Sequence, residues 1–274
     1  MKIDSHQHFW KYSKKKHAWI NEEMKVLQSD FLPKDLKPLL DDSNIGGCVA
    51  VQADQSLAEN KFLLGLAKKN DWIQGVVGWV DLNSHSVESD LEKYKSESKF
   101  VGVRHILQDE EADFMLTKSF NRGVSALKYY DLTYDVLIYE NQMEAAIEFV
   151  RRHPYTRMVL DHMAKPLIKE GLTSPWEKYL KEMGQMENLF VKMSGWSTEA
   201  DWGKWTPEDI APYLEICLES FGPERIMYGS DWPVSNLATE YSEVVGVVEN
   251  FISTLSVDEQ DAIFGNNAME FYSL

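Results

Sequence analysis

The chain has 274 residues, of which 44% are hydrophobic, so it is long enough to bury one large core. Its formal net charge of −16 argues against nucleic-acid and anionic-membrane partners, because both would repel it. The two cysteines, Cys48 and Cys217, lie in apolar runs, which excludes a disulfide framework and predicts buried, reduced thiols. No secretory-signal pattern and no apolar run long enough to span a membrane are seen, so we expect a cytoplasmic protein.

Eight short apolar runs recur along the chain, separated by longer amphipathic stretches. Most runs are continuous and β-branched, as in strands that are covered on both faces. Strands that alternate with helices form a parallel sheet, and eight such units predict one (β/α)₈ barrel domain over residues 1–274. An open doubly wound sheet would carry a Gly-rich turn after its first strand, and the residues there are His-Gln-His-Phe-Trp. The predicted strands are residues 2–8, 47–52, 74–80, 100–106, 133–139, 157–162, 189–195 and 225–231.

Helix starts are predicted at three places between these runs. Ser174-Pro175-Trp176-Glu177 has the pattern of a capping box with proline at the first helical position. Thr206-Pro207-Glu208-Asp209 and the segment from Ser256 to Glu259 predict two more starts. The longest connection, residues 9–46, contains one short predicted helix at 31–40. Because long loops in compact domains are commonly lids or binding loops, we expect a lid over the barrel mouth.

Histidines stand where the first and sixth predicted strands end. His6 and His8 are two residues apart, which places both imidazoles on one face of the strand. Such a pair fits a zinc-type ion or an oxyanion, and the alternative is a half-buried strand whose histidines bond to neighbours. In the sixth strand we expect His162 to point into the barrel and Asp161 to bond behind it.

Three further strand ends carry charged side chains. Asp231 follows the eighth strand, where it could act as a general base or, alternatively, as a turn residue. Arg104 could donate to a substrate oxygen or pair with a carboxylate. Lys192 could bind substrate, lower a neighbour's pKa or form an ion pair in the barrel wall.

Four tryptophans also follow strand ends, where flat rings could stack on a sugar or plug the barrel mouth. They are Trp10, Trp79, Trp196 and Trp232.

Phosphate-binding glycine loops, G-x-S-x-G and H-E-x-x-H are absent from the sequence, so neither a nucleotide cofactor nor serine-hydrolase chemistry is expected.

Five motifs occur along the chain in the order DSHQHFW, GVRHILQDE, VLDHMAKP, KMSGW and MYGSDWPV. Together they resemble the amidohydrolase superfamily, and within it the sugar-lactonase branch of L-fuconolactonase-like and L-rhamnonolactonase-like proteins. The resemblance covers nearly the whole chain. It implies a (β/α)₈ barrel that hydrolyses a sugar lactone to an aldonic acid, a reaction of carbohydrate metabolism such as L-fucose degradation.

The resemblance also implies site residues. The catalytic and metal-binding positions it matches are His6, His8, His162 and Asp231. Arg104, His105 and Gln108 match an R-H-x-x-Q stretch that contacts substrate, and we add Lys192 and Trp232 as substrate-binding candidates. Binuclear members use a carbamylated lysine on a middle strand, and strands 100–106 and 133–139 contain none. One zinc ion or no metal is therefore expected.

The resulting hypothesis is that Asp231 takes a proton from water, which attacks the lactone carbonyl. His6, His8 and His162 would stabilise the oxyanion, directly or through one metal ion. Two alternatives remain open: a metal-dependent decarboxylase of the same superfamily and a non-catalytic barrel that binds sugar acids. The sequence leaves the sugar, the ring size and the choice between monomer and homo-oligomer open.

Overall fold

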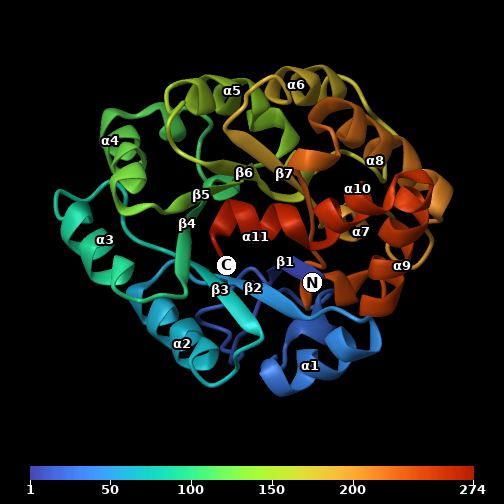
Figure 1. Ribbon diagram of the computed structural model, residues 1–274, viewed down its shortest axis with the longest axis horizontal. Coiled ribbons are helices and arrows are strands. Elements are labelled where there is room, and N and C mark those ends of the chain that lie inside the picture. Colours follow the sequence, from blue (N-terminus) through green and yellow to red (C-terminus); the bar gives the residue numbers. More distant parts are fainter.

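The computed structural model describes residues 1–274 as a ring of eight parallel strands in the order β1 to β8. Helices lie between consecutive strands and surround the ring (Figure 1). The predicted (β/α)₈ barrel is therefore confirmed. The strands are β1 Ile3–Gln7, β2 Gly47–Val51, β3 Ile73–Gly78, β4 Phe100–Ile106, β5 Thr133–Leu137, β6 Met158–Leu160, β7 Leu189–Met193 and β8 Ile226–Tyr228. The α-helices are α1 Pro33–Asp42, α2 Leu57–Ala67, α3 Val87–Lys95, α4 Lys118–Leu127, α5 Met143–Arg151, α6 Trp176–Met183, α7 Trp196–Glu199, α8 Pro207–Phe221, α9 Tyr241–Phe251, α10 Val257–Asp261 and α11 Asn267–Tyr272.

The first and last strands meet through hydrogen bonds that continue past the end of β8. The Ser5 hydroxyl donates to the Tyr228 carbonyl at 2.7 Å. The amide of Asp231 donates to the His6 carbonyl at 2.8 Å, and the amide of His8 donates to the Trp232 carbonyl at 2.7 Å. These bonds fix the segment after β8 against β1, so Asp231 is held beside the two histidines of β1.

The C-terminal helix α11 closes the end of the barrel that lies opposite the carboxyl ends of the strands. It lies across the ring of strands in Figure 1. Phe271 and Tyr272 of α11 pack with a layer of strand residues that includes Ile3, Val51 and Val77. With that end plugged by apolar side chains, the carboxyl ends of the strands are left to form a cavity.

Two of the three predicted helix starts are confirmed. Thr206 and Asp209 form a reciprocal capping box at α8, and Ser256 forms one with Glu259 at α10. The prediction at Ser174 was wrong, because α6 begins at Trp176 and Pro175 occupies the cap position without a side-chain hydrogen bond. Proline has no side-chain acceptor, so it cannot satisfy the free amides of the first turn.

The long connection after β1 lies against the barrel mouth. Trp10 and Phe31 pair through reciprocal backbone hydrogen bonds of 3.0 and 2.9 Å, which close residues 10–31 of this connection into a loop. The predicted short helix is present as α1. Whether the connection opens and closes as a lid stays a prediction. No helix combines the length and apolar character that crossing a bilayer requires.

Candidate functional site

A cavity of about 340 Å³ opens at the carboxyl ends of the strands. Its wall mixes apolar and charged side chains, a composition typical of small-molecule sites. The lining residues are His8, Trp10, Trp19, Met24, Ala53, Arg104, Ile106, Gln108, Asp109, Leu137, Tyr139, His162, Lys165, Thr198, Glu199, Trp202, Asp231, Val234 and Leu237.

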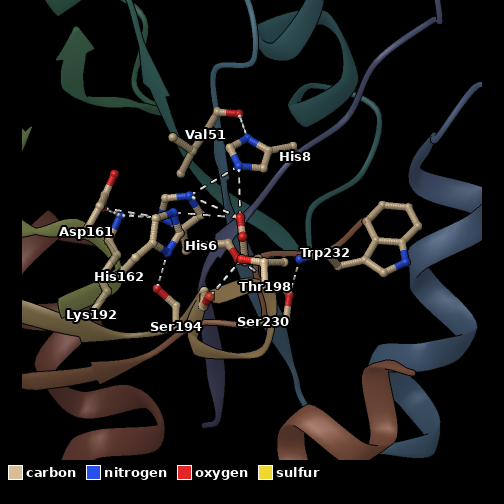
Figure 2. Close-up of polar contacts among 12 residues, drawn as sticks. His6, His8, Val51, Asp161, His162, Lys192, Ser194, Thr198, Ser230 and Trp232 are labelled. Carbon is tan, nitrogen blue, oxygen red and sulfur yellow. Dashed lines mark hydrogen bonds and ion pairs between the residues drawn. The ribbon is translucent and has the colours of Figure 1, made fainter. Parts of the chain in front are cut away.

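Three imidazoles converge on one carboxylate at the base of this cavity. The rings of His6, His8 and His162 face one another in Figure 2. Oδ1 of Asp231 lies 3.3 Å from Nε2 of His8 and 3.8 Å from Nε2 of both His6 and His162. All four side chains are almost fully buried. The arrangement can therefore bind a cation or accept a proton in a site largely shielded from solvent.

The other ring nitrogen of each histidine contacts a fixed partner. Nδ1 of His8 lies 2.8 Å from the Val51 carbonyl, which can only accept, so this nitrogen carries the proton and Nε2 presents a lone pair. Nδ1 of His162 lies 2.9 Å from Oγ of Ser194. These contacts orient the rings toward Asp231 and decide which nitrogen is available to a ligand.

A layer of buried charges lies directly beneath the histidines. Nζ of Lys192 is 2.5 Å from Asp135, 3.0 Å from Asp161 and 3.1 Å from Nδ1 of His6. Arg104 donates to Asp161 at 3.1 Å and to the Gln52 carbonyl at 2.6 Å. These groups neutralise one another in the barrel interior, and through the Lys192 and Asp161 contacts they fix the ring of His6.

The ionisable groups of the cavity have shifted pKa values. Burial lowers the pKa of His162 to about 4, although the charges of Asp231 and Asp161 oppose the shift, so this ring is neutral near pH 7. Burial raises the pKa of Asp231, but the neighbouring histidines, His162 above all, outweigh it, and the net pKa is well below the usual range. Burial raises the pKa of Glu199, partly offset by the charge of Lys165. At neutral pH Asp231 is therefore ionised beside the neutral ring of His162.

An unusual backbone segment places His162. Residues 162–165 have consecutive positive φ angles of 55°, 53°, 60° and 51°, a conformation that non-glycine residues rarely adopt. It turns the chain sharply after β6, so that both His162 and Lys165 face the cavity. Gly195, with φ of 68°, lies against the His162 ring where a side chain would not fit. Strain of this kind is typical of functional sites.

Residues 3–274 match the amidohydrolase family. The chain belongs to this family. The L-fucono-1,5-lactonase of Burkholderia multivorans is 39% identical over 100% of this chain and 96% of that protein. The L-fucono-1,5-lactonase of Burkholderia ambifaria is 33% identical over 100% and 96%. A crystal structure of an amidohydrolase from Burkholderia multivorans with bound zinc is 38% identical, covers 100% of this chain and 99% of its own, and superposes with a TM-score of 0.96.

The donor set of this amidohydrolase fits a zinc ion. His6, His8 and Asp231 offer two imidazole nitrogens and one carboxylate oxygen within 4.8 Å of one another. Nε2 of His6 lies 3.2 Å from Nε2 of His8, and both nitrogens lie beside the carboxylate of Asp231, so the three groups converge on one point. Three such ligands, with a fourth position left for water or substrate, are typical of catalytic zinc. His162 groups instead with His6 and Asp161.

Two of the five expected substrate-binding residues line the cavity, namely Arg104 and Gln108. His105 lies on the other face of β4, because successive strand residues alternate, and it stacks on Phe114. Lys192 is 0% exposed and lies below the histidines, as an ion pair of the barrel wall rather than a contact of the cavity.

Trp232, the fifth expected substrate-binding residue, does not line the cavity either. It points away from the histidines in Figure 2 and packs edge-on against Phe9 and Phe31. Of the other strand-end tryptophans, Trp10 lines the cavity, and Trp79 and Trp196 do not.

Other cavity residues escaped the sequence reasoning. Trp19 and Trp202 lie in irregular loops, far from any predicted strand end. Lys165 and Glu199 follow the sixth and seventh strands by a few residues. Lys165 lies within the VLDHMAKP motif, which could have indicated it, but no periodic pattern in the sequence indicated the other three.

Proposed function

We propose that this amidohydrolase hydrolyses a sugar lactone, of the L-fucono-1,5-lactone type, to the aldonic acid. The observation that carries the proposal is the carboxyl group of Asp231 surrounded by His6, His8 and His162 at the base of a cavity large enough for a monosaccharide. The two L-fucono-1,5-lactonases that match it over its whole length support the same substrate class. The natural partner is then a small-molecule lactone.

In the proposed reaction, Asp231 accepts a proton from water, and the water oxygen attacks the lactone carbonyl. The low pKa of Asp231 keeps its carboxylate ionised at neutral pH, so its oxygens are free of a proton when water binds. When the tetrahedral intermediate collapses, the bond to the ring oxygen breaks, and Asp231 returns its proton to that oxygen. One water is consumed, and one hydroxyl and one carboxylic acid are formed.

His162 has a different role from the histidines of β1. Ser194 can donate to Nδ1 of His162 at 2.9 Å, which leaves Nε2–H free to donate to the developing oxyanion. His6 and His8, together with Asp231, would hold a zinc ion. Bound there, zinc would supply a Lewis acid for the carbonyl oxygen. Arg104 faces the cavity and would orient the substrate.

The first test is acid release from a panel of aldonolactones, with L-fucono, L-rhamnono, L-galactono and D-arabinono forms, corrected for spontaneous hydrolysis. Turnover of one or a few establishes the class. Asp231→Asn should lower kcat by at least ~10²-fold, since it removes the base and keeps the size of the side chain. A near-normal rate in Asp231→Asn contradicts the role of Asp231. If no lactone of the panel is hydrolysed faster than its spontaneous rate, with zinc supplied, the result contradicts the lactonase proposal as a whole.

A further inference from the structure

Two charged side chains of the cavity have no hydrogen bond within the protein. Nζ of Lys165 is 3.8 Å from Oε1 of Glu199, which is longer than a hydrogen bond. The same ammonium lies 5.0 Å from the centroid of the Tyr139 ring. The two side chains are only 17% and 22% exposed, so the cavity wall covers most of their surface.

This pair differs from the other charged groups near the site. Lys192, Asp135, Asp161 and Arg104 all make short contacts with one another in the barrel interior. A loose, half-buried ion pair stabilises a fold very little, because desolvation of both charges offsets their attraction. The energetics of folding therefore give no reason for Lys165 and Glu199 to face the cavity together.

The backbone holds both residues in place without using their side-chain ends. Lys165 ends the left-handed segment that begins at His162, and its amide donates to the His162 carbonyl at 2.8 Å. Glu199 ends α7, and its carbonyl accepts from the amide of Lys169 at 3.0 Å. The ammonium and the carboxylate are thus fixed side by side on the same wall, facing the same space as Asp231.

Building on the proposed lactonase function, we infer that Lys165 and Glu199 form hydrogen bonds with the hydroxyl groups of the substrate and make the enzyme selective for polyhydroxylated lactones. The ammonium can donate up to three hydrogen bonds, and the carboxylate can accept several from hydroxyls. Gln108, whose Oε1 is also buried without a partner, lies in the same cavity. A lactone without hydroxyls leaves these groups unpaired, and buried unpaired groups discriminate strongly against such analogues.

The test compares two lactones and two pairs of variants. Lys165→Met and Glu199→Gln each remove one charge from the cavity, and Lys169→Met and Glu170→Gln are matched controls on exposed positions of the same loop. The substrates are the best aldonolactone of the panel and δ-valerolactone, which has the ring and no hydroxyls. L-Fucitol, which has hydroxyls and no carbonyl, is added as a competitive inhibitor.

We expect each cavity variant to lower kcat/KM for the aldonolactone by roughly 10- to 100-fold, the effect of one hydrogen bond to a charged group. The rate with δ-valerolactone should stay within about threefold, inhibition by L-fucitol should weaken in parallel, and both controls should behave as the wild type. Equal losses on both lactones, or unchanged kcat/KM and L-fucitol inhibition in the cavity variants, overturn the inference. A wild-type enzyme that hydrolyses no lactone contradicts the proposed function instead.

Discussion

Gly195→Ala tests whether the position of the His162 ring controls catalysis. A Cβ at residue 195 would lie 2.5 Å from Nδ1 and 2.6 Å from Cγ of His162. Ordinary contacts are about 3.5 Å, so the ring must move by roughly 1 Å, away from its hydrogen bond to Ser194. A shift of this size in a catalytic group lowers the rate by about 100-fold. We expect that loss in kcat/KM for the best aldonolactone.

Gly171→Ala is the matched control. Gly171 has a φ of 66°, close to the 68° of Gly195, but no atom lies within 4 Å of the position that its Cβ would occupy. Both variants should lose about 1–2 kcal/mol of unfolding free energy from the left-handed backbone, and Gly195→Ala should lose about 1–3 kcal/mol more from overpacking. Chemical denaturation measures the unfolding free energy, and steady-state kinetics measures kcat/KM. A Gly195→Ala enzyme with kcat/KM within threefold of Gly171→Ala refutes the reasoning.

Three further predictions concern stability. Lys192→Met should lower the free energy of unfolding by about 3–5 kcal/mol in urea, since it leaves Asp135 without a cationic partner in the interior and Asp161 with Arg104 alone; a loss under 1 kcal/mol contradicts this. Burial raises the pKa of Glu59 from 4.5 to about 7 on folding. The protonated carboxyl therefore contributes fully to the free energy of unfolding below about pH 4.5, and this contribution is lost as the pH rises through 7. Glu59→Gln should therefore be more stable than wild type at pH 8, by up to about 3 kcal/mol, and equal to it at pH 4, as measured by urea unfolding at both values. Zinc added to chelator-treated protein should raise the Tm, and no shift at millimolar zinc contradicts the metal site.

The histidine pair shows what local pattern can predict. His6 and His8 lie in a strand, and the two-residue repeat of a strand alone places them on one face. The same rule assigns Arg104 and His105 to opposite faces of β4, but it does not say which face is the interior. The resemblance to the family favoured both, and the structure places only Arg104 at the cavity. Membership of a motif therefore did not decide contact with the cavity.

Asp161 and His162 show the limit of extending a strand pattern to its end. The apolar run predicts a strand through residue 162, and β6 ends at Leu160. The left-handed turn that follows brings Asp161 to Lys192 and His162 to the cavity, so both side chains face the interior region. Four consecutive positive φ angles have no signature in residues such as methionine, alanine and lysine. Only the packing of neighbouring strands maintains such a conformation.

The sequence alone determined the barrel, the position of its eight strands and the histidine and aspartate candidates at its mouth, because apolar runs and their spacing follow from burial in a parallel sheet. The tertiary structure decided which side chains meet. It brings Lys165 beside Glu199, adds Trp19 and Trp202 to the wall of the cavity and places Lys192 beneath the histidines. These contacts depend on irregular loops and on closure of the ring, and neither property is periodic in the sequence.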